Sequence, residues 1–191
     1  MAVEEPKFDL VLKDGAFEVR DYGPLLVAEV TVTGDQQQAG RKGFGLLAKY
    51  IFGGNTQQRK IAMTAPVTKI AHGQTITMTA PVTQIKSEAS WQVRFAMPGN
   101  LAQADLPEPN NHAVTIIALP PRRTAVLGFS GLAGETKVAA IAYELRNIIE
   151  ARGMRPVGLA VIALYNPPWT PWFLRRNEVM FDVAGEMSER P

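Results

Sequence analysis

Hydrophobic and polar residues first alternate regularly from Phe17 onward, and this alternation predicts a β-strand. The segment Tyr22-Gly23-Pro24 has the composition of a turn, and a second strand is expected after it. Strand-forming residues continue to Val32, and Gly34-Asp35 ends them. The chain is therefore expected to begin with antiparallel β-structure.

From Gln36 to Phe52 the hydrophobic period changes from two residues to that of a helix. An apolar stripe recurs at spacings i, i+3, i+4 and i+7, and it consists of Phe44, Leu47, Ala48 and Ile51. Three glycines interrupt this segment, and each lowers helix stability by up to ~1 kcal/mol relative to alanine. Such small residues permit close approach either of a flat ligand or of a sheet, and both interpretations stay open.

The hexapeptide MTAPVT occurs twice after this helix, at Met63–Thr68 and at Met78–Thr83. Pro66 and Pro81 lack an amide donor, so each must occupy a strand end, an edge or a bulge. The two copies are therefore predicted to be two strands folded back as a hairpin, with its tip near Ala71–Gln74.

A further strand is expected at Trp91–Met97, and the proline-rich stretch from Ala102 to Asn111 reads as a connector. Shifting the sequence by 97 positions then places Pro24 on Pro121, Gly34 on Gly131 and Ile51 on Ile148. This self-similarity indicates an internal duplication, with pseudo-repeats at about 8–100 and 112–184 within one domain spanning 1–191. The predicted fold class is α+β: duplicated β-α-β-β halves form a pseudo-twofold, mostly antiparallel, eight-stranded distorted barrel with two helices packed on it.

The bulk composition is that of an ordinary globular protein. Of 191 residues, 46% are hydrophobic and 20% charged, and the net charge of +2 gives no reason to expect nucleic-acid binding. Since cysteine is absent, disulfides and thiolate chemistry are excluded. No apolar run approaches the ~18–20 residues that span a bilayer, and the acidic N-terminus does not resemble a secretory signal. We therefore expect a cytoplasmic protein without membrane insertion.

Candidate catalytic chemistry is sparse. The two histidines, His72 and His112, lie in predicted turns and are interpreted as solvated rather than as metal ligands. Serines are few, and none has a histidine base near it in sequence. No catalytic residue is predicted, and the metal ligand, if any, stays open.

The segment YNPPWTPWFLRRNEVMF, Tyr165–Phe181, is the most unusual part of the chain. Its prolines fix the backbone and its two tryptophans present large apolar rings. One interpretation is that Trp169 and Trp172 cover one end of the core. The other is that they form the rim of a site for a flat apolar ligand, with Arg175 or Arg176 available to a carboxylate.

Five stretches, FEVRDYGPLLVAEV, KIAMTAPVT, WQVRFAMP, PPWTP and RRNEV, together resemble the SOUL haem-binding protein family. The resemblance runs from about Phe8 to Val183. It implies a duplicated barrel similar to bacterial effector-binding domains. It also implies that haem or a related porphyrin binds in a shallow apolar groove beside the first helix, without a pair of strong axial ligands.

Carried onto this chain, the resemblance implies binding positions on the first helix, on the segment after it and on the proline-rich loop. The residues are Lys42, Phe44, Leu47, Lys49, Tyr50, Ile51, Arg59, Met63, Trp169, Trp172, Phe173 and Arg175. This chain departs from some members in two places. The first helix contains no histidine, and Thr170 stands where some members carry a lysine.

The predicted function is that of a carrier or buffer for haem or a related tetrapyrrole. A small-molecule effector-binding or sensor module is the alternative, by analogy with the similar fold. A tetrapyrrole-modifying enzyme is favoured least, because no acid–base histidine falls in the implied groove.

Overall fold

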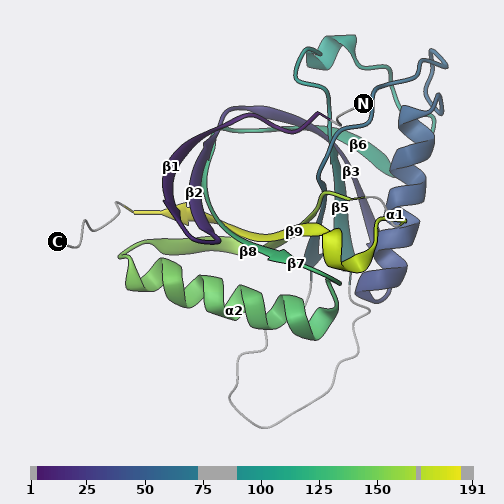
Figure 1. Ribbon diagram of the computed structural model, residues 1–191. Helices are drawn as coiled ribbons and strands as arrows, with labels where there is room; N and C mark the ends of the chain where they lie inside the picture. Colours follow the sequence, from purple (N-terminus) through teal and green to yellow (C-terminus); the bar gives the residue numbers. More distant parts are fainter. Residues whose placement is uncertain (1–3, 73–89, 167–168, 186–191) are drawn as a thin grey trace, which may run out of the picture.

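The computed structural model describes residues 4–72, 90–166 and 169–185. These residues form a nine-stranded antiparallel sheet that curls around its own concave face, and two helices cover the outer face (Figure 1). The strands are β1 Phe8–Asp14, β2 Phe17–Tyr22, β3 Leu25–Thr33, β4 Val67–His72, β5 Ser90–Ala96, β6 Val114–Leu119, β7 Arg122–Ser130, β8 Arg155–Leu164 and β9 Arg176–Ala184. The helices are α1 Gln36–Ile51 and α2 Glu135–Ala151, with short 3-10 turns η1 Gln103–Asp105 and η2 Trp172–Leu174.

The strand order is β1-β2-β7-β9-β8-β4-β5-β3-β6, so β1 and β6 are the two edges and the curled sheet is not closed into a barrel. The α+β class and the two helices are confirmed, but the predicted count of eight strands was wrong. The additional strand is β1. The register of its pairing with β2 shifts between Leu10 and Leu12, and such an irregularity interrupts the alternation that reveals a strand in sequence.

The strand order reads the same from both sides once β1 is set aside and β2, β3, β4 and β5 are matched with β6, β7, β8 and β9. Strands β2 and β6 begin at residues 17 and 114, and β3 and β7 begin at 25 and 122, the same offset of 97 in both cases. This symmetry supports the internal duplication, which stays a prediction, as does the division of a single domain into two pseudo-repeats.

The hydrophobic core lies between the sheet and the helices in two clusters, one under each helix. Under α1, Leu47 and Ile51 pack with Val93 and Phe95 of the sheet. Under α2, the cluster includes Phe17, Leu145, Ile149, Val179 and Phe181. Burial of each such side chain contributes roughly 1.5–3 kcal/mol, so every strand commits one of its two faces to a helix.

Asp35 caps the N-terminus of helix α1, because its carboxylate accepts hydrogen bonds from the backbone N–H groups of Gln37 and Gln38. Its contact with the sheet explains one of its glycines. A Cβ at Gly43 would lie 2.5 Å from Val93 Cγ2, whereas a Cβ at Gly45 would meet nothing within 4 Å. At Gly43, therefore, the small residue permits helix–sheet contact.

The first MTAPVT copy leads into β4, and Pro66 precedes that strand directly, as predicted. Strand β4 pairs with β5 along one edge and with β8 along the other. Because both edges are occupied over Val67–Ile70, this strand does not form the predicted hairpin with the second copy. Met78–Thr83 lies outside the described residues.

We expect Gly43→Ala to lower the free energy of unfolding by about 1–3 kcal/mol, because the methyl group would overpack against Val93. Gly45→Ala is the matched control in the same helix and is expected to raise stability by up to ~1 kcal/mol. Urea denaturation of both variants measures the difference. Equal effects would contradict the close contact between α1 and β5.

Candidate functional site

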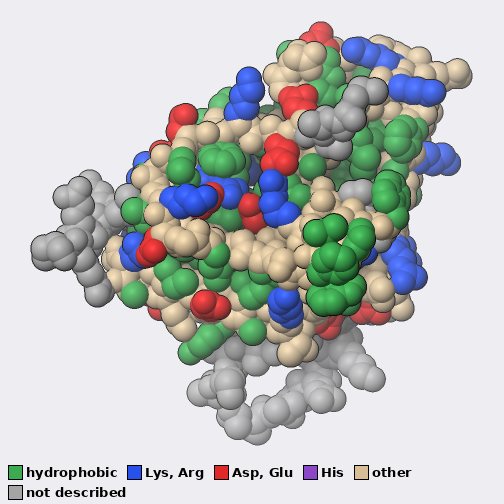
Figure 2. Space-filling model, viewed as in Figure 1, with side chains coloured by type: hydrophobic (Ala, Val, Ile, Leu, Met, Phe, Trp, Pro, Cys, Tyr) green, Lys and Arg blue, Asp and Glu red, His purple; other side chains and the backbone are tan. Residues whose placement is uncertain are grey.

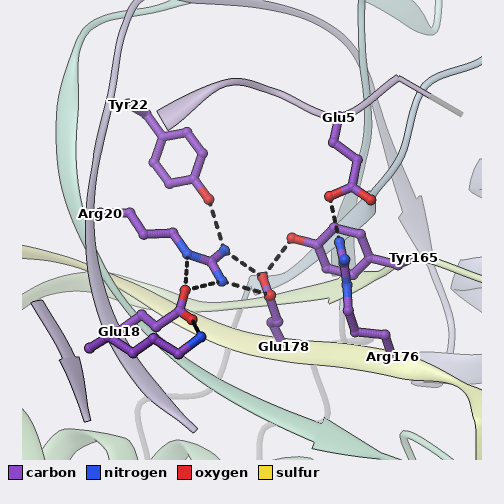
Figure 3. A network of polar contacts seen from close by, with 8 residues as sticks. Glu5, Glu18, Arg20, Tyr22, Tyr165, Arg176 and Glu178 are labelled. Carbon is purple, nitrogen blue, oxygen red and sulfur yellow. Dashed lines mark hydrogen bonds and ion pairs between the residues drawn. The ribbon is translucent and has the colours of Figure 1, made fainter. Parts of the chain in front are cut away.

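A network of charged and phenolic side chains occupies the concave face of the sheet, with Glu178 of β9 at its centre (Figure 3). Both terminal nitrogens of Arg20 donate to the two carboxylate oxygens of Glu178 at 2.9 Å. The hydroxyl of Tyr165 donates to the same carboxylate at 2.5 Å. Arg20 and Glu178 are 6% and 5% exposed, so this ion pair is withdrawn from solvent.

Arg20 also donates hydrogen bonds to two other side chains of β2. Its Nε donates to Glu18 at 2.7 Å and its Nη1 donates to the hydroxyl of Tyr22 at 3.2 Å, while Lys13 donates to Glu18 at 2.8 Å. These side chains share one face of β2 because Phe17 and Val19 on the other face lie in the core under α2. This network was not predicted, although the alternation in FEVRDY already places Glu18, Arg20 and Tyr22 on one face of a strand.

Arg20 and Tyr165 keep their protons near neutral pH. Burial alone would lower the pKa of Arg20, but the hydrogen bonds to Glu178 and Tyr22 and the negative charge of Glu178 together outweigh burial, and the pKa lies above the ordinary value. Burial raises the pKa of the Tyr165 hydroxyl, and the neighbouring Glu178 carboxylate raises it further. This arrangement favours a structural role for the network over proton transfer.

The N-terminal segment crosses one mouth of the concave face. Glu4 accepts hydrogen bonds from the N–H of Ala65 at 2.8 Å and of Gly99 at 3.0 Å. Glu5 pairs with Arg176 at 2.5 Å, and the Arg176 guanidinium lies 3.6 Å from the ring centroid of Tyr165. The cavity beneath this segment has a volume of about 180 Å³, and its lining includes Tyr22, Val27, Val161, Tyr165 and Met180.

A larger depression lies between the β1–β2 turn, the end of β7 and the proline-rich loop. Its volume is about 480 Å³. Three large apolar side chains contribute to its lining, Phe129, Phe173 and Leu174. The charged side chains of the lining are four cations and two carboxylates: Lys13, Arg20, Arg175, Arg176, Glu18 and Glu178. The depression therefore combines apolar surface with an excess of positive charge.

The proline-rich loop presents its aromatic rings to solvent. Trp172 and Phe173 meet edge to face with centroids 5.7 Å apart, and Arg175 Nε donates to the carbonyl of Thr170 at 2.9 Å. Trp169 is 82% exposed, and Trp172, Phe173 and Leu174 are about 60% exposed. Figure 2 shows a prominent hydrophobic cluster at this place, beside hydrophobic side chains over α1. The interpretation that the tryptophans cover the core was therefore wrong.

The binding residues that were predicted on α1 fall into two groups, one buried in the core and one exposed. Leu47, Tyr50 and Ile51 are at most 1% exposed, and the Tyr50 hydroxyl donates to the carbonyl of Pro107. They belong to the core and present no surface to a ligand. Lys42 and Lys49 are exposed, and the ring of Phe44 lies partly exposed against Phe95.

The predicted residues after α1 lie near its core cluster. Met63 is half-buried against that cluster, and Arg59 Nη1 donates to the carbonyl of Asp105 at 3.1 Å. The described lining of the larger depression includes Phe173 and Arg175 but none of the predicted residues from Lys42 to Met63. Of the residues implied by the resemblance, the larger depression therefore brings together Phe173 and Arg175; the role of the others stays a prediction.

The two histidines differ in their surroundings. His112 lies in an exposed turn as predicted, whereas His72 is the last residue of β4 and is half-buried. Its Nε2 is buried and has no hydrogen-bond partner among the described residues. Over the same residues, no group of three or more histidine, aspartate or glutamate side chains is placed to hold a metal ion.

Solved structures with the same arrangement identify the class of the fold. The C-terminal domain of EcmrR matches with a TM-score of 0.63 at 10% identity, covering 89% of this chain and 98% of that one. SAV2435 bound to tetraphenylphosphonium matches with a TM-score of 0.51 at 15% identity, covering 88% and 94%. The curled sheet with two outer helices is thus a fold that this chain shares with both of these proteins.

Sequence comparison narrows this class to one family. A family model described as SOUL heme-binding protein matches residues 3–182. Heme-binding protein 2 of Mus musculus is 29% identical over 157 residues, covering 80% of this chain and 72% of the relative. Heme-binding protein 2 of Homo sapiens is 27% identical over 190 residues, covering 93% and 88%. The chain belongs to the SOUL heme-binding protein family.

We expect Glu178→Leu to lower the free energy of unfolding by about 3 kcal/mol or more, because it removes a carboxylate partner from buried Arg20. The double variant Arg20→Met/Glu178→Leu should recover much of this loss. Asp21→Asn, on the same strand as Arg20, is the matched control, since it breaks an exposed pair with Arg123 of β7 and should cost less than about 1 kcal/mol. Urea denaturation compares the variants, and a double variant as unstable as the sum of its singles would contradict the pairing.

Tyr165 should make stability fall at alkaline pH. Its pKa is raised in the folded state, so above about pH 10 the unfolded chain releases a proton that the folded chain retains, and folding is opposed. The contribution is complete below the unfolded pKa and is lost as the pH rises, by up to about 1.4 kcal/mol per pH unit. In denaturation between pH 9 and 11, Tyr165→Phe should show a shallower decline than the unaltered protein; parallel declines would exclude the effect.

Proposed function

We propose that this protein binds haem or a related tetrapyrrole non-covalently in the depression beside the proline-rich loop, as a carrier or buffer. The observation that carries the proposal is the conjunction of exposed apolar side chains, Phe173 and Leu174, with an excess of cations over carboxylates around one depression of about 480 Å³. Membership of the SOUL heme-binding protein family supports haem as the ligand class.

The side chains present fit the chemistry of a porphyrin. Phe129, Phe173 and Leu174 offer contact to an apolar ring face, and the basic side chains offer partners for propionate groups. Lys13 and Arg176 are about half exposed and are paired with Glu18 and Glu5. Because solvent-exposed ion pairs contribute little, a propionate can replace either carboxylate at small cost.

The described lining of the depression contains no histidine or methionine. We therefore propose that affinity comes from contact with the porphyrin face and edge rather than from two strong axial ligands. Trp172 would act indirectly, since its ring supports Phe173 edge to face. The cytoplasmic location stays a prediction; neither helix of the described part of the chain is suited by length and hydrophobicity to cross a membrane.

Two other candidate sites, the concave cavity and the surface beside α1, suit a porphyrin less well. The concave cavity of about 180 Å³ is comparable to a cavity of roughly 150 Å³ that holds benzene, so it takes a single ring rather than a tetrapyrrole. Beside α1, the apolar residues implied by the resemblance are largely in the core. The loop therefore remains the better supported part of the predicted site.

Titration with haem should give a saturable Soret change with a dissociation constant in the micromolar range or tighter, about 8 kcal/mol or more. Phe173→Ala should weaken binding roughly tenfold, about 1.4 kcal/mol, because it removes ring contact. Phe44→Ala is the matched control, since this phenylalanine is partly exposed on α1; it should leave the affinity unchanged. An effect confined to Phe44→Ala would move the site to α1, and a spectrum identical to that of free haem would exclude haem binding.

The same preparation separates the two alternative functions. Tetraphenylphosphonium could raise the melting temperature of the protein. If added haem does not abolish that increase, the result would favour an effector-binding module. Loss of the Soret band on incubation with reductant and oxygen would favour a tetrapyrrole-modifying enzyme. We expect neither result.

A further inference from the structure

Trp169 and Trp172 form the most protruding apolar feature of the loop, which we name the tryptophan tip. They are 82% and 60% exposed, and neither contributes to the described lining of the adjacent depression. In Figure 2 the hydrophobic side chains of this region stand out from the surface. The tip is therefore a convex apolar surface that the proposed ligand site does not use.

Positive charge lies beside the tip. Arg175 and Arg176 follow it in the sequence, and the segment 166–177 contains no aspartate or glutamate. A Cβ on Gly131, in the β7–α2 connection, would lie 3.3 Å from Nζ of Lys137 in α2 and 3.8 Å from the Trp172 ring. Lys137 therefore lies close to the indole.

One cation of this surface is already paired, because Glu5 forms an ion pair with Arg176 at 2.5 Å. Both side chains are about half exposed, and an exposed pair contributes little, so an anionic headgroup can compete with Glu5 for Arg176. Glu135 accepts a hydrogen bond from the backbone N–H of Gln36 at 3.1 Å. The combination of exposed indoles with neighbouring cations complements a negatively charged surface that also accepts apolar groups.

Hydrogen bonds hold the backbone that carries Trp172. The N–H of Leu174 donates to the carbonyl of Pro171 at 3.0 Å, closing the turn η2. Arg175 Nε donates to the carbonyl of Thr170 at 2.9 Å, and Pro171 fixes its own φ. Since this part of the backbone is already ordered, contact through Trp172 loses little backbone entropy.

We propose that the tryptophan tip docks this protein peripherally on an anionic lipid surface. Indole rings prefer the headgroup level of a bilayer, where an apolar body and a polar N–H are both accommodated. Lysine and arginine beside them are attracted by anionic lipid. A bilayer accepts a convex apolar tip without a matching pocket, which a protein partner would have to supply. The contact needs no spanning segment, and it revises the expectation of no membrane insertion to interfacial contact by these side chains.

Docking through the tip would hold the neighbouring depression close to the lipid surface. This consequence rests on the proposed function, because it matters only if the depression binds an amphiphilic tetrapyrrole. The docking itself does not depend on that ligand.

Vesicle co-sedimentation without haem tests the proposal, using phosphatidylcholine vesicles with and without phosphatidylserine. We expect binding to the phosphatidylserine vesicles, a blue shift of tryptophan fluorescence, and weakening by added salt. Trp169→Ala/Trp172→Ala should lower the partition coefficient at least about tenfold. Tyr143→Ala is the matched control, since Tyr143 is 69% exposed on α2, and it should bind like the unaltered protein.

Equal binding of the unaltered protein and the double tryptophan variant would overturn the proposal, as would absence of binding to phosphatidylserine vesicles. Sedimentation equilibrium that shows a dimer dependent on the two tryptophans, with no vesicle binding, would assign the tip to a second copy of the chain instead. Haem titration of the double variant keeps the two proposals apart. Vesicle binding without any haem binding would refute only the proposed function, and retained haem affinity with lost vesicle binding would support the tip as a separate surface.

Discussion

The rest of the structure depends on the antiparallel pairing of β4 with β8. This pairing, with Thr68 opposite Ala163 and Lys69 opposite Ile162, joins two groups of strands that each pack under their own helix. Two further pairings join the two halves of the chain: β2 of the first half pairs with β7, and β6 of the second half pairs with β3. A single curled sheet results, and its concave face becomes an interior that neither group of strands would enclose alone.

That interior is filled with polar groups because the strands have committed their other face to the helices. Arg20 and Glu178 lie 158 positions apart in the chain, yet they meet across β2, β7 and β9. Buried ion pairs often contribute little net stability compared with apolar packing. Here the pair satisfies the charges that strand alternation places inside, and together with Tyr22 and Tyr165 it leaves room for a small molecule only.

The proposed site for a large ligand lies where the loop between β8 and β9 meets the polar network of the concave face. The aromatic side chains of this loop remain exposed because proline and the turn η2 hold them away from the core. Maintaining four large apolar side chains in water confers no folding stability, and exposed apolar patches of this kind commonly mark interaction sites. The proposed ligand site and the proposed lipid contact use different side chains of this one loop.

Local signals in the sequence determined much of the fold. The turn at Tyr22-Gly23-Pro24, the change of hydrophobic period at Gln36 and the alternation beginning at Trp91 each follow from neighbouring residues, and each matches an observed element. The family motifs likewise depend on sequence alone, and they identified haem as the candidate ligand class. The strand β1 was not predicted from the sequence, because its register shift interrupts the alternation of hydrophobic and polar residues.

Only the tertiary structure decided which side chains a ligand can reach. Leu47 and Tyr50 satisfy the pattern of a helix facing a groove as well as that of a helix facing a sheet, and the packing of Gly43 on Val93 selects the sheet. The meeting of Arg20 with Glu178 and the exposure of Trp169 and Trp172 depend on contacts between distant segments. A sequence determines the periodicity of each segment locally, whereas burial and long-range pairing arise only when the whole chain has folded.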